Sequence, residues 1–244
     1  YGYGIDSFNY GLGSSNAWVS DVEVSSTGYT YLCGYYKNSL TLGTTTVTGD
    51  NTNHNFFVAK VDSNWESVWI HHGDIGHNSW TVTSPSYSKA GIALDSQENV
   101  YFTGVFREDF TFSTETLTGT GNNFDIFIGQ VSSDGNLSQL NGYGSNGSDY
   151  SYGIDVDENG FVYFFGHSFS SPITFGNVSI TSSGSIVVKF NSQLEAQWGM
   201  SSNGTQENAT KDLIIGESGD VYITGFYKYR IFTGTNHELE SNTA

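Results

Sequence analysis

The chain has 244 residues, enough for one large all-β domain, and it carries a formal net charge of -17 with only 8 Lys and Arg. This charge argues strongly against nucleic-acid binding, because a phosphate backbone requires a positive patch on its partner. No run of about 18 apolar residues occurs, so we expect no membrane span. The 30 Gly, 17 Phe and 16 Tyr, with only 2 Pro, suit an all-β protein.

An internal repeat organises the chain. Versions of the stretch Asn99-Val-Tyr-Phe-Thr-Gly-Val-Phe106 recur with a period of roughly 60 to 70 residues. Each copy has a glycine and, three positions before it, a tyrosine: Gly34 with Tyr31, Gly104 with Tyr101, Gly166 with Tyr163, and Gly225 with Tyr222. Apolar residues alternate with period two, and sustained helical spacing is absent, so helical repeats are excluded.

In chain order, the first unit predicts four strands, at residues 22–24, 30–36, 40–47 and 56–61. A polar turn joins the first two strands into a hairpin, and the third strand is a Thr-rich run. The same order recurs at residues 92–131 and 154–190, and a fourth unit begins at residue 213.

A four-stranded meander with this period is typical of a β-propeller blade, since one blade must pack face to face with its neighbours. A tandem of separate sandwiches is the competing interpretation, but the unit is short for a sandwich domain of roughly 100 residues. We therefore predict a single β-propeller domain over residues 1–244. Its repeat units are 1–69, 70–140, 141–198 and a partial unit at 199–244.

Three motifs in the second unit resemble a known family. They are G-I-A-L-D-S-Q-E-N-V-Y-F-T-G at residues 91–104, T-F-S-T-E-T-L-T at 111–118 and D-I-F-I-G-Q-V-S-S-D-G-N at 125–136. With them the chain resembles the bacterial β-propeller repeats called SBBP, and the likeness covers most of the sequence. The resemblance implies a secreted or surface-attached bacterial protein, hence an extracellular location, and it supplies no catalytic motif.

Successive loops of a meander emerge on opposite faces of a blade. We expect the turns after the first and third strands to form a strongly acidic face without Lys or Arg, and most basic residues to lie on the other face. Weak Ca²⁺ binding on the acidic face is the one cofactor interaction expected. Its predicted ligands are Asp95, Asp157, Glu158 and Glu217.

Residues 70–89 form an insertion about twice as long as the corresponding loops, and long loops on a rigid scaffold often carry function. Trp80 and Tyr87 could stack on a sugar ring, or could simply pack the loop onto its blade. His71 and His77 are further candidate ligand-binding residues, and with His72 and Asp74 they could ligate a transition metal.

Several single positions also carry expectations. Cys33, the only cysteine, is expected to be a small buried core residue. Trp69 and Trp198 are expected to wedge between adjacent blades. Asn-X-Ser/Thr sequons, which are candidate glycosylation sites, occur at Asn136, Asn146, Asn177, Asn203 and Asn208.

No G-x-S-x-G, P-loop or H-E-x-x-H motif occurs, so the sequence makes no case for an enzyme. We expect a non-catalytic structural or adhesive surface protein; the alternatives are a glycan-binding module and, less favoured, a secreted hydrolase or lyase. The fourth unit lacks its last strand, which predicts either a piece of a longer propeller or self-assembly in which neighbouring copies complete one another. Oppositely charged faces would favour head-to-tail contact and a filament.

Overall fold

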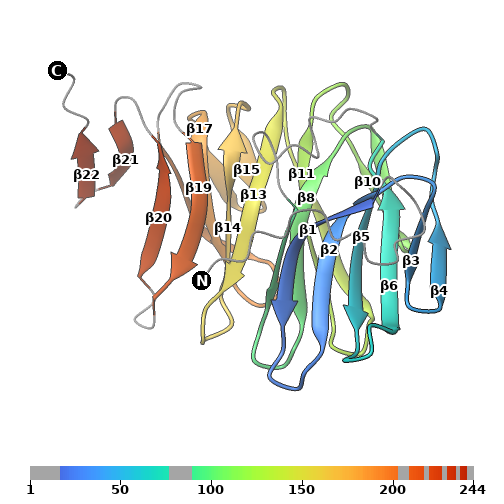
Figure 1. The fold of residues 1–244 in the computed structure, drawn as a ribbon. Helices are drawn as coiled ribbons and strands as arrows, with labels where there is room; N and C mark the ends of the chain where they lie inside the picture. Colours follow the sequence, from blue (N-terminus) through green and yellow to red (C-terminus); the bar gives the residue numbers. More distant parts are fainter. Residues whose placement is uncertain are drawn as a thin grey trace.

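The computed structural model describes residues 17–76, 90–202, 209–216, 220–226, 230–234 and 237–240. This part of the chain consists of antiparallel sheets joined by turns and contains no helix (Figure 1). The prediction of an all-β protein made of repeated antiparallel sheets is therefore confirmed. Within the same residues, no helix is long and apolar enough to cross a membrane.

The first repeat unit contributes four strands to a six-stranded sheet, whose other two strands come from the second unit, and it carries an inserted hairpin. The four strands have the order β1 (Ala17–Val24), β2 (Thr30–Tyr36), β5 (Asn55–Val61) and β6 (Ser67–Asp74), and the hairpin is β3 (Ser39–Leu42) and β4 (Thr45–Thr48). The two central strands, β2 and β5, are buried along almost their whole length. Burial on both faces explains why these strands are continuous apolar runs in the sequence.

The second and third units repeat this design. The second contains β7 (Gly91–Leu94), β8 (Val100–Phe106), β9 (Asp109–Phe112), β10 (Glu115–Thr118), β11 (Asp125–Val131) and β12 (Leu137–Tyr143). The third contains β13 (Asp149–Val156), β14 (Val162–Ser168), β15 (Ile173–Phe175), β16 (Val178–Ile180), β17 (Gly184–Phe190) and β18 (Ala196–Ser201). The fourth begins with β19 (Ala209–Ile215) and β20 (Val221–Phe226), followed by the hairpin β21 (Arg230–Gly234) and β22 (His237–Glu240).

The prediction that each Thr-rich run is a single strand is wrong. The run at residues 40–47 folds back on itself as β3 and β4, with Leu42 opposite Thr45. Gly43 has a φ of 60° at this turn, and Ser113 and Gly176 have φ values of 55° and 59° at the corresponding turns. Because the hairpin leaves the sheet, β5 pairs directly with β2. The fourth strand of each sheet was not predicted, because it is the segment that follows the last predicted strand of the unit.

That fourth strand changes the interpretation of residues 70–89. Residues 70–74 belong to β6, so the predicted loop begins within a strand. Residues 77–89 lie outside the described part of the chain. The fourth strands β6, β12 and β18 also run across the predicted unit boundaries at residues 69, 140 and 198.

Successive sheets pack face to face through apolar clusters. Between the first and second sheets, Phe56 lies 4.8 Å from Phe127 between ring centroids, and Phe127 lies 4.7 Å from Phe110 of the inserted hairpin. Further clusters join the second sheet to the third and the third to the fourth. Along one side of the molecule β7 lies against β1 and β13, and β13 lies against β19, so the sheets follow one another in chain order (Figure 1).

The predictions for the core residues Cys33, Trp69 and Trp198 are confirmed. Cys33 is fully buried in the first cluster, as expected. Trp69 packs against the same cluster and touches the turn at Gly135 of the second unit, and Trp198 packs between the third and fourth sheets beside Tyr163. The expectation that both tryptophans wedge between neighbouring units is confirmed.

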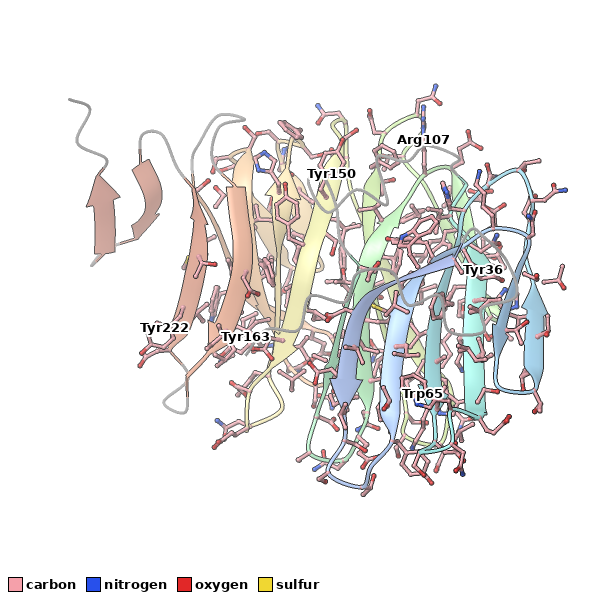
Figure 2. The ribbon with its side chains drawn as sticks, in the orientation of Figure 1. Tyr36, Trp65, Arg107, Tyr150, Tyr163 and Tyr222 are labelled. Carbon is pink, nitrogen blue, oxygen red and sulfur yellow. The ribbon has the colours of Figure 1, made fainter. Side chains whose placement is uncertain are left out.

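The sheets have two distinct ends. We call the end with the β1–β2 and β5–β6 turns, and their equivalents, the turn end; the opposite end, where the inserted hairpins leave and rejoin, is the hairpin end. Figure 2 shows Trp65 at the turn end and Arg107 and Tyr150 at the hairpin end.

The predicted separation of charge between these two ends is wrong. Asp50 precedes β5 and Asp125 begins β11, so both lie at the hairpin end and not with the acidic turns. Conversely, Lys60 and Lys189 lie near the turn end, which was expected to have no basic residue. The error follows from the hairpin, because a run that folds back returns the chain to the end from which it started.

Candidate functional site

A polar hollow of about 470 Å³ lies at the hairpin end of the first unit. It is bounded by the β3–β4 hairpin, by the outer strand β6 and by β9 of the second unit. Its polar lining residues are Thr48, Asp50, Asn55, His71, His72, Asp74, Thr111 and Ser113. Small-molecule sites typically occupy roughly 300 to 1,000 Å³, so the hollow is large enough for one.

His72 is fixed within this hollow by Tyr36. The Tyr36 hydroxyl lies 2.6 Å from Nδ1 of His72, and the two rings are 6.0 Å apart between centroids. Burial, and then the neighbouring His71, lower the pKa of His72 below its ordinary value. The imidazole is therefore neutral near pH 7, and its Nε2 is the nitrogen left for another partner.

Neutral donors hold the acidic side chains of the hollow in place. Asp74 accepts hydrogen bonds from the Asn53 side-chain amide at 3.1 Å and from the Gly76 backbone N–H at 2.8 Å. The hydroxyl and the backbone N–H of Thr52 donate to Asp50 and lower the pKa of its carboxyl. Each carboxylate is thus fixed in place and keeps unused acceptor capacity.

The buried side chain of Asn55 completes the frame. It accepts a hydrogen bond from the Asp50 backbone N–H at 3.2 Å and donates one to the Asp50 carbonyl at 2.9 Å. With the hydroxyl groups of Thr111 and Ser113, the lining offers both donors and acceptors around one space. Such a lining can hold a polar ligand by hydrogen bonds, whereas its described residues include no Phe, Tyr or Trp for stacking.

The predicted ligand-binding residues do not come together in the described structure. His71 neighbours His72 on β6, but successive side chains of a strand point to opposite faces. Its Nε2 lies 2.8 Å from the Gly135 carbonyl oxygen, and its ring lies beside Trp69 and Phe112 in the packing between sheets. His77, Trp80 and Tyr87 lie outside the described residues.

The predicted calcium ligands occupy separate turns. Asp95 accepts the backbone N–H groups of Gln97 and Asn99, each at 2.9 Å, and Asp157 holds its own turn in the same way. Glu158 is exposed, and Glu217 lies outside the described residues. Among the residues that the structure describes, no group of three or more His, Cys, Asp or Glu is arranged to hold a metal ion. Weak calcium binding stays a prediction.

A repeated polar cluster at the turn end was missed by the sequence analysis. Lys60 Nζ lies 3.6 Å from Glu98 Oε2 of the second unit and 4.2 Å from the centroid of the Tyr29 ring. The Tyr31 hydroxyl donates to the same carboxylate at 2.8 Å. In the third unit Lys189 lies 3.9 Å both from Asp157 Oδ2 and from the Phe161 ring centroid. Aligning the repeats on their tyrosines would have revealed the shared lysine position.

Carboxyl groups also gather near the first strands of the units. Burial, followed by the negative charges of Asp21 and Asp155, raises the pKa of Glu23 to about 7. Asp21 accepts the Ile92 N–H at 3.1 Å and Asp155 accepts the Ile215 N–H at 3.3 Å, so both bind the next sheet. These groups serve the packing of the sheets.

The sequons within the described residues are accessible. Asn136, Asn146 and Asn177 are all exposed, on turns or loops at different places on the molecule. Asn203 and Asn208 lie outside the described residues. Exposed turns can accept a glycan without disturbing the core, so glycosylation at the first three positions remains a prediction compatible with the fold.

No family model matches this sequence, and the comparison with curated proteins finds no relative. The resemblance to the SBBP repeats therefore rests on the three motifs of the second unit. Those motifs correspond to β7–β8, β9–β10 and β11 with its following turn.

Proposed function

We propose that this chain is a non-catalytic, extracellular structural protein of the β-propeller type, and that it is a building block of a cell-surface or fibrillar assembly. One observation carries the proposal: two large apolar side chains are exposed on the outward face of β19 and β20, beside the exposed polar pair Asp212 and Thr224. Ile214 and Tyr222 lie opposite each other across these strands and are 54% and 58% exposed. Tyr222 lies on the outer side of this sheet (Figure 2).

The equivalent tyrosines of the earlier units are buried by the sheet that follows. Tyr31, Tyr101 and Tyr163 are each at most 1% exposed. The Tyr31 hydroxyl donates to Glu98 of the second unit, and the Tyr101 hydroxyl donates to the Ser192 carbonyl of the third. Tyr222 and Ile214 therefore lie where each earlier unit receives the following sheet, and we assign that sheet to a second copy of the chain.

This contact differs from the head-to-tail contact expected from the sequence. Because acidic and basic groups occur at both ends of the sheets, charge gives no preferred stacking of one end on the other. An apolar contact is insensitive to salt or is strengthened by it, whereas contacts between exposed charges are screened within about 10 Å at 0.1 M ionic strength. Assembly should therefore persist in high salt.

Three further parts of the proposal have their own support. The propeller arrangement is supported by the succession β1, β7, β13 and β19, which would be the inner strands of consecutive blades. The extracellular location is supported by the acidic composition and the exposed sequons. A structural function is supported by the Lys60–Glu98 pair at the turn end, because it joins the first and second sheets.

Sedimentation velocity of the purified chain tests the assembly. The wild type should form larger species as its concentration rises, and the variants Ile214→Lys and Tyr222→Lys should stay monomeric. Val68→Lys is the matched control, because Val68 is 53% exposed on the outer strand β6. A wild type that remains monomeric at every concentration and salt would refute the building-block function. Equal assembly of all variants would support assembly but would show that the face around Ile214 and Tyr222 is not the contact between copies.

A further inference from the structure

At the hairpin end, the second unit has positions equivalent to those of the hollow but lacks its tyrosine–histidine pair. Strand registers equate His72 with Gly142 and Tyr36 with Phe106. A Cβ added at Gly142 would lie 3.3 Å from the Phe106 ring, so this ring fills the space above the glycine. The second unit therefore forms the same strands with an apolar ring over a glycine, and the scaffold does not require the Tyr36–His72 pair.

The acidic residues of the hollow, Asp50 and Asp74, also have no acidic counterpart in the second unit. The same registers equate Asp74 with Gly144 and Asp50 with Thr120. In both units the backbone N–H at the latter position donates to the first residue of the next strand, to Asn55 Oδ1 in one and to Asp125 Oδ2 in the other. The bond to the next strand therefore does not use the Asp50 side chain, which accepts hydrogen bonds from Thr52 and lines the hollow.

From these differences we propose that the polar hollow of the first unit binds a neutral, polyhydroxylated ligand, and that the ligand is a saccharide. The hollow presents fixed carboxylate acceptors at Asp50 and Asp74, a neutral imidazole at His72, and the hydroxyl-bearing residues Ser113 and Thr111, the latter also bonded to Thr116. Sugar hydroxyls donate and accept at once, so they can satisfy this mixed set of groups. The volume of about 470 Å³ accommodates a small saccharide.

Two other ligand classes fit the lining less well. A transition-metal or calcium site needs several His, Cys, Asp or Glu around one point, and the described residues contain no such group of three. An ammonium group carries donors alone, so it could bind the carboxylates but could accept no hydrogen bond from the hydroxyl-bearing residues of the lining. Neutral hydroxyl groups need only the remaining acceptor capacity of these oxygens.

Saccharide binding goes beyond the proposed structural function and does not depend on it. The hollow lies within the first unit and at its junction with the second, far along the chain from the exposed face of β19 and β20. The Tyr222→Lys variant, intended to be monomeric, can therefore be used in binding measurements. A failure of assembly would leave the saccharide site untouched, and a failure of binding would leave assembly untouched.

Saturation-transfer NMR with glucose, galactose, mannose and N-acetylglucosamine, followed by a glycan array, tests the inference on the full chain. At least one saccharide should bind the wild type, and Asp74→Asn should weaken that binding at least tenfold. The double variant Tyr36→Phe with His72→Gly has the residues of the second unit, Phe106 and Gly142, at the equivalent positions, and it should also lose binding. Asp109→Asn is the matched control, because Asp109 is an exposed acid on β9 that does not line the hollow, and it should bind like the wild type.

Thermal melting of each variant separates lost binding from lost folding. If the double variant does not fold, Asp74→Asn decides the question alone. Absence of binding to every probe and to the array would overturn the inference. Binding that is unchanged in Asp74→Asn would place the saccharide elsewhere and overturn it as well. Binding abolished by a chelator would show a cation in place of direct hydrogen bonding and would likewise contradict it.

Discussion

At the scale of single residues, the repeat separates structural positions from the others. The tyrosine that marks each repeat in the sequence has a structural role in the first three units, because Tyr31, Tyr101 and Tyr163 are all buried. The partners of these tyrosines could not be predicted. Glu98 and Ser192 belong to the next unit in each case, and their approach depends on how the sheets pack.

Glu23 makes stability depend on pH. Its pKa rises from 4.5 to about 7 on folding, so ionisation costs more in the folded protein than in the unfolded chain. Its favourable contribution is complete below about pH 4.5 and is lost as the pH rises through 7. Asp149, whose pKa burial raises to about 6, acts in the same direction. The wild type should therefore melt at a higher temperature at pH 5 than at pH 8.

Replacing Glu23 by Gln should remove part of this dependence. At pH 8 the variant should melt about 2 to 4 °C above the wild type for each 1 kcal/mol recovered. Glu115→Gln, at an exposed position on β10, is the control and should follow the wild-type profile. Calorimetry at pH 5 and pH 8 measures both. A wild type that is more stable at pH 8, or a Glu23→Gln profile like that of the wild type, would contradict this assignment.

Phe127 should be among the most sensitive core positions. It is fully buried and lies within 4.8 Å of Phe56 and 4.7 Å of Phe110, measured between centroids. Truncation to Ala should cost about 3 to 5 kcal/mol in the free energy of unfolding, from lost burial and the cavity left behind. Phe169→Ala, at a residue 38% exposed, should cost much less. Denaturant titrations of both variants that gave equal losses would disprove the packing described between the first two sheets.

At the scale of elements, local sequence predicted which segments form strands but not always how they pair. The Thr-rich runs have strand periodicity in both their halves, and the turn at Gly43 breaks that periodicity only weakly. What decides the pairing is the contact between β2 and β5, whose residues lie far apart in sequence. The same missed hairpin explains why β6 was taken for a loop, and why the hollow around His72 could not be predicted.

The junction between β6 and β9 gives a test at this scale. Gly73 pairs with Phe112, and a Cβ at Gly73 would lie 2.1 Å from the Thr111 carbonyl oxygen, which belongs to the backbone and cannot move aside easily. Gly73→Ala should therefore cost about 1 to 3 kcal/mol by overpacking. Gly142→Ala, where the nearest atom is the flexible end of Leu117, should cost less. Equal costs in denaturant titrations would argue against close pairing of β6 with β9.

At the scale of the whole molecule, the sequence predicted repeated antiparallel sheets that pack face to face, because a fixed period with period-two alternation leaves few other architectures. It could not predict the distribution of charge over the two ends, which depends on the inserted hairpins. Nor could it identify the face around Ile214 and Tyr222. That face is recognised only by comparison with the buried faces of the three preceding sheets.

Electron microscopy of the purified wild-type chain tests the central claim most directly. Images recorded over a range of protein concentrations, in low salt and in about 0.5 M salt, should show particles that contain more than one chain and that persist in high salt, because the proposed contact is apolar. The Tyr222→Lys variant should give only single-chain particles under the same conditions. Uniform single-chain particles of the wild type at every concentration and salt would contradict the account.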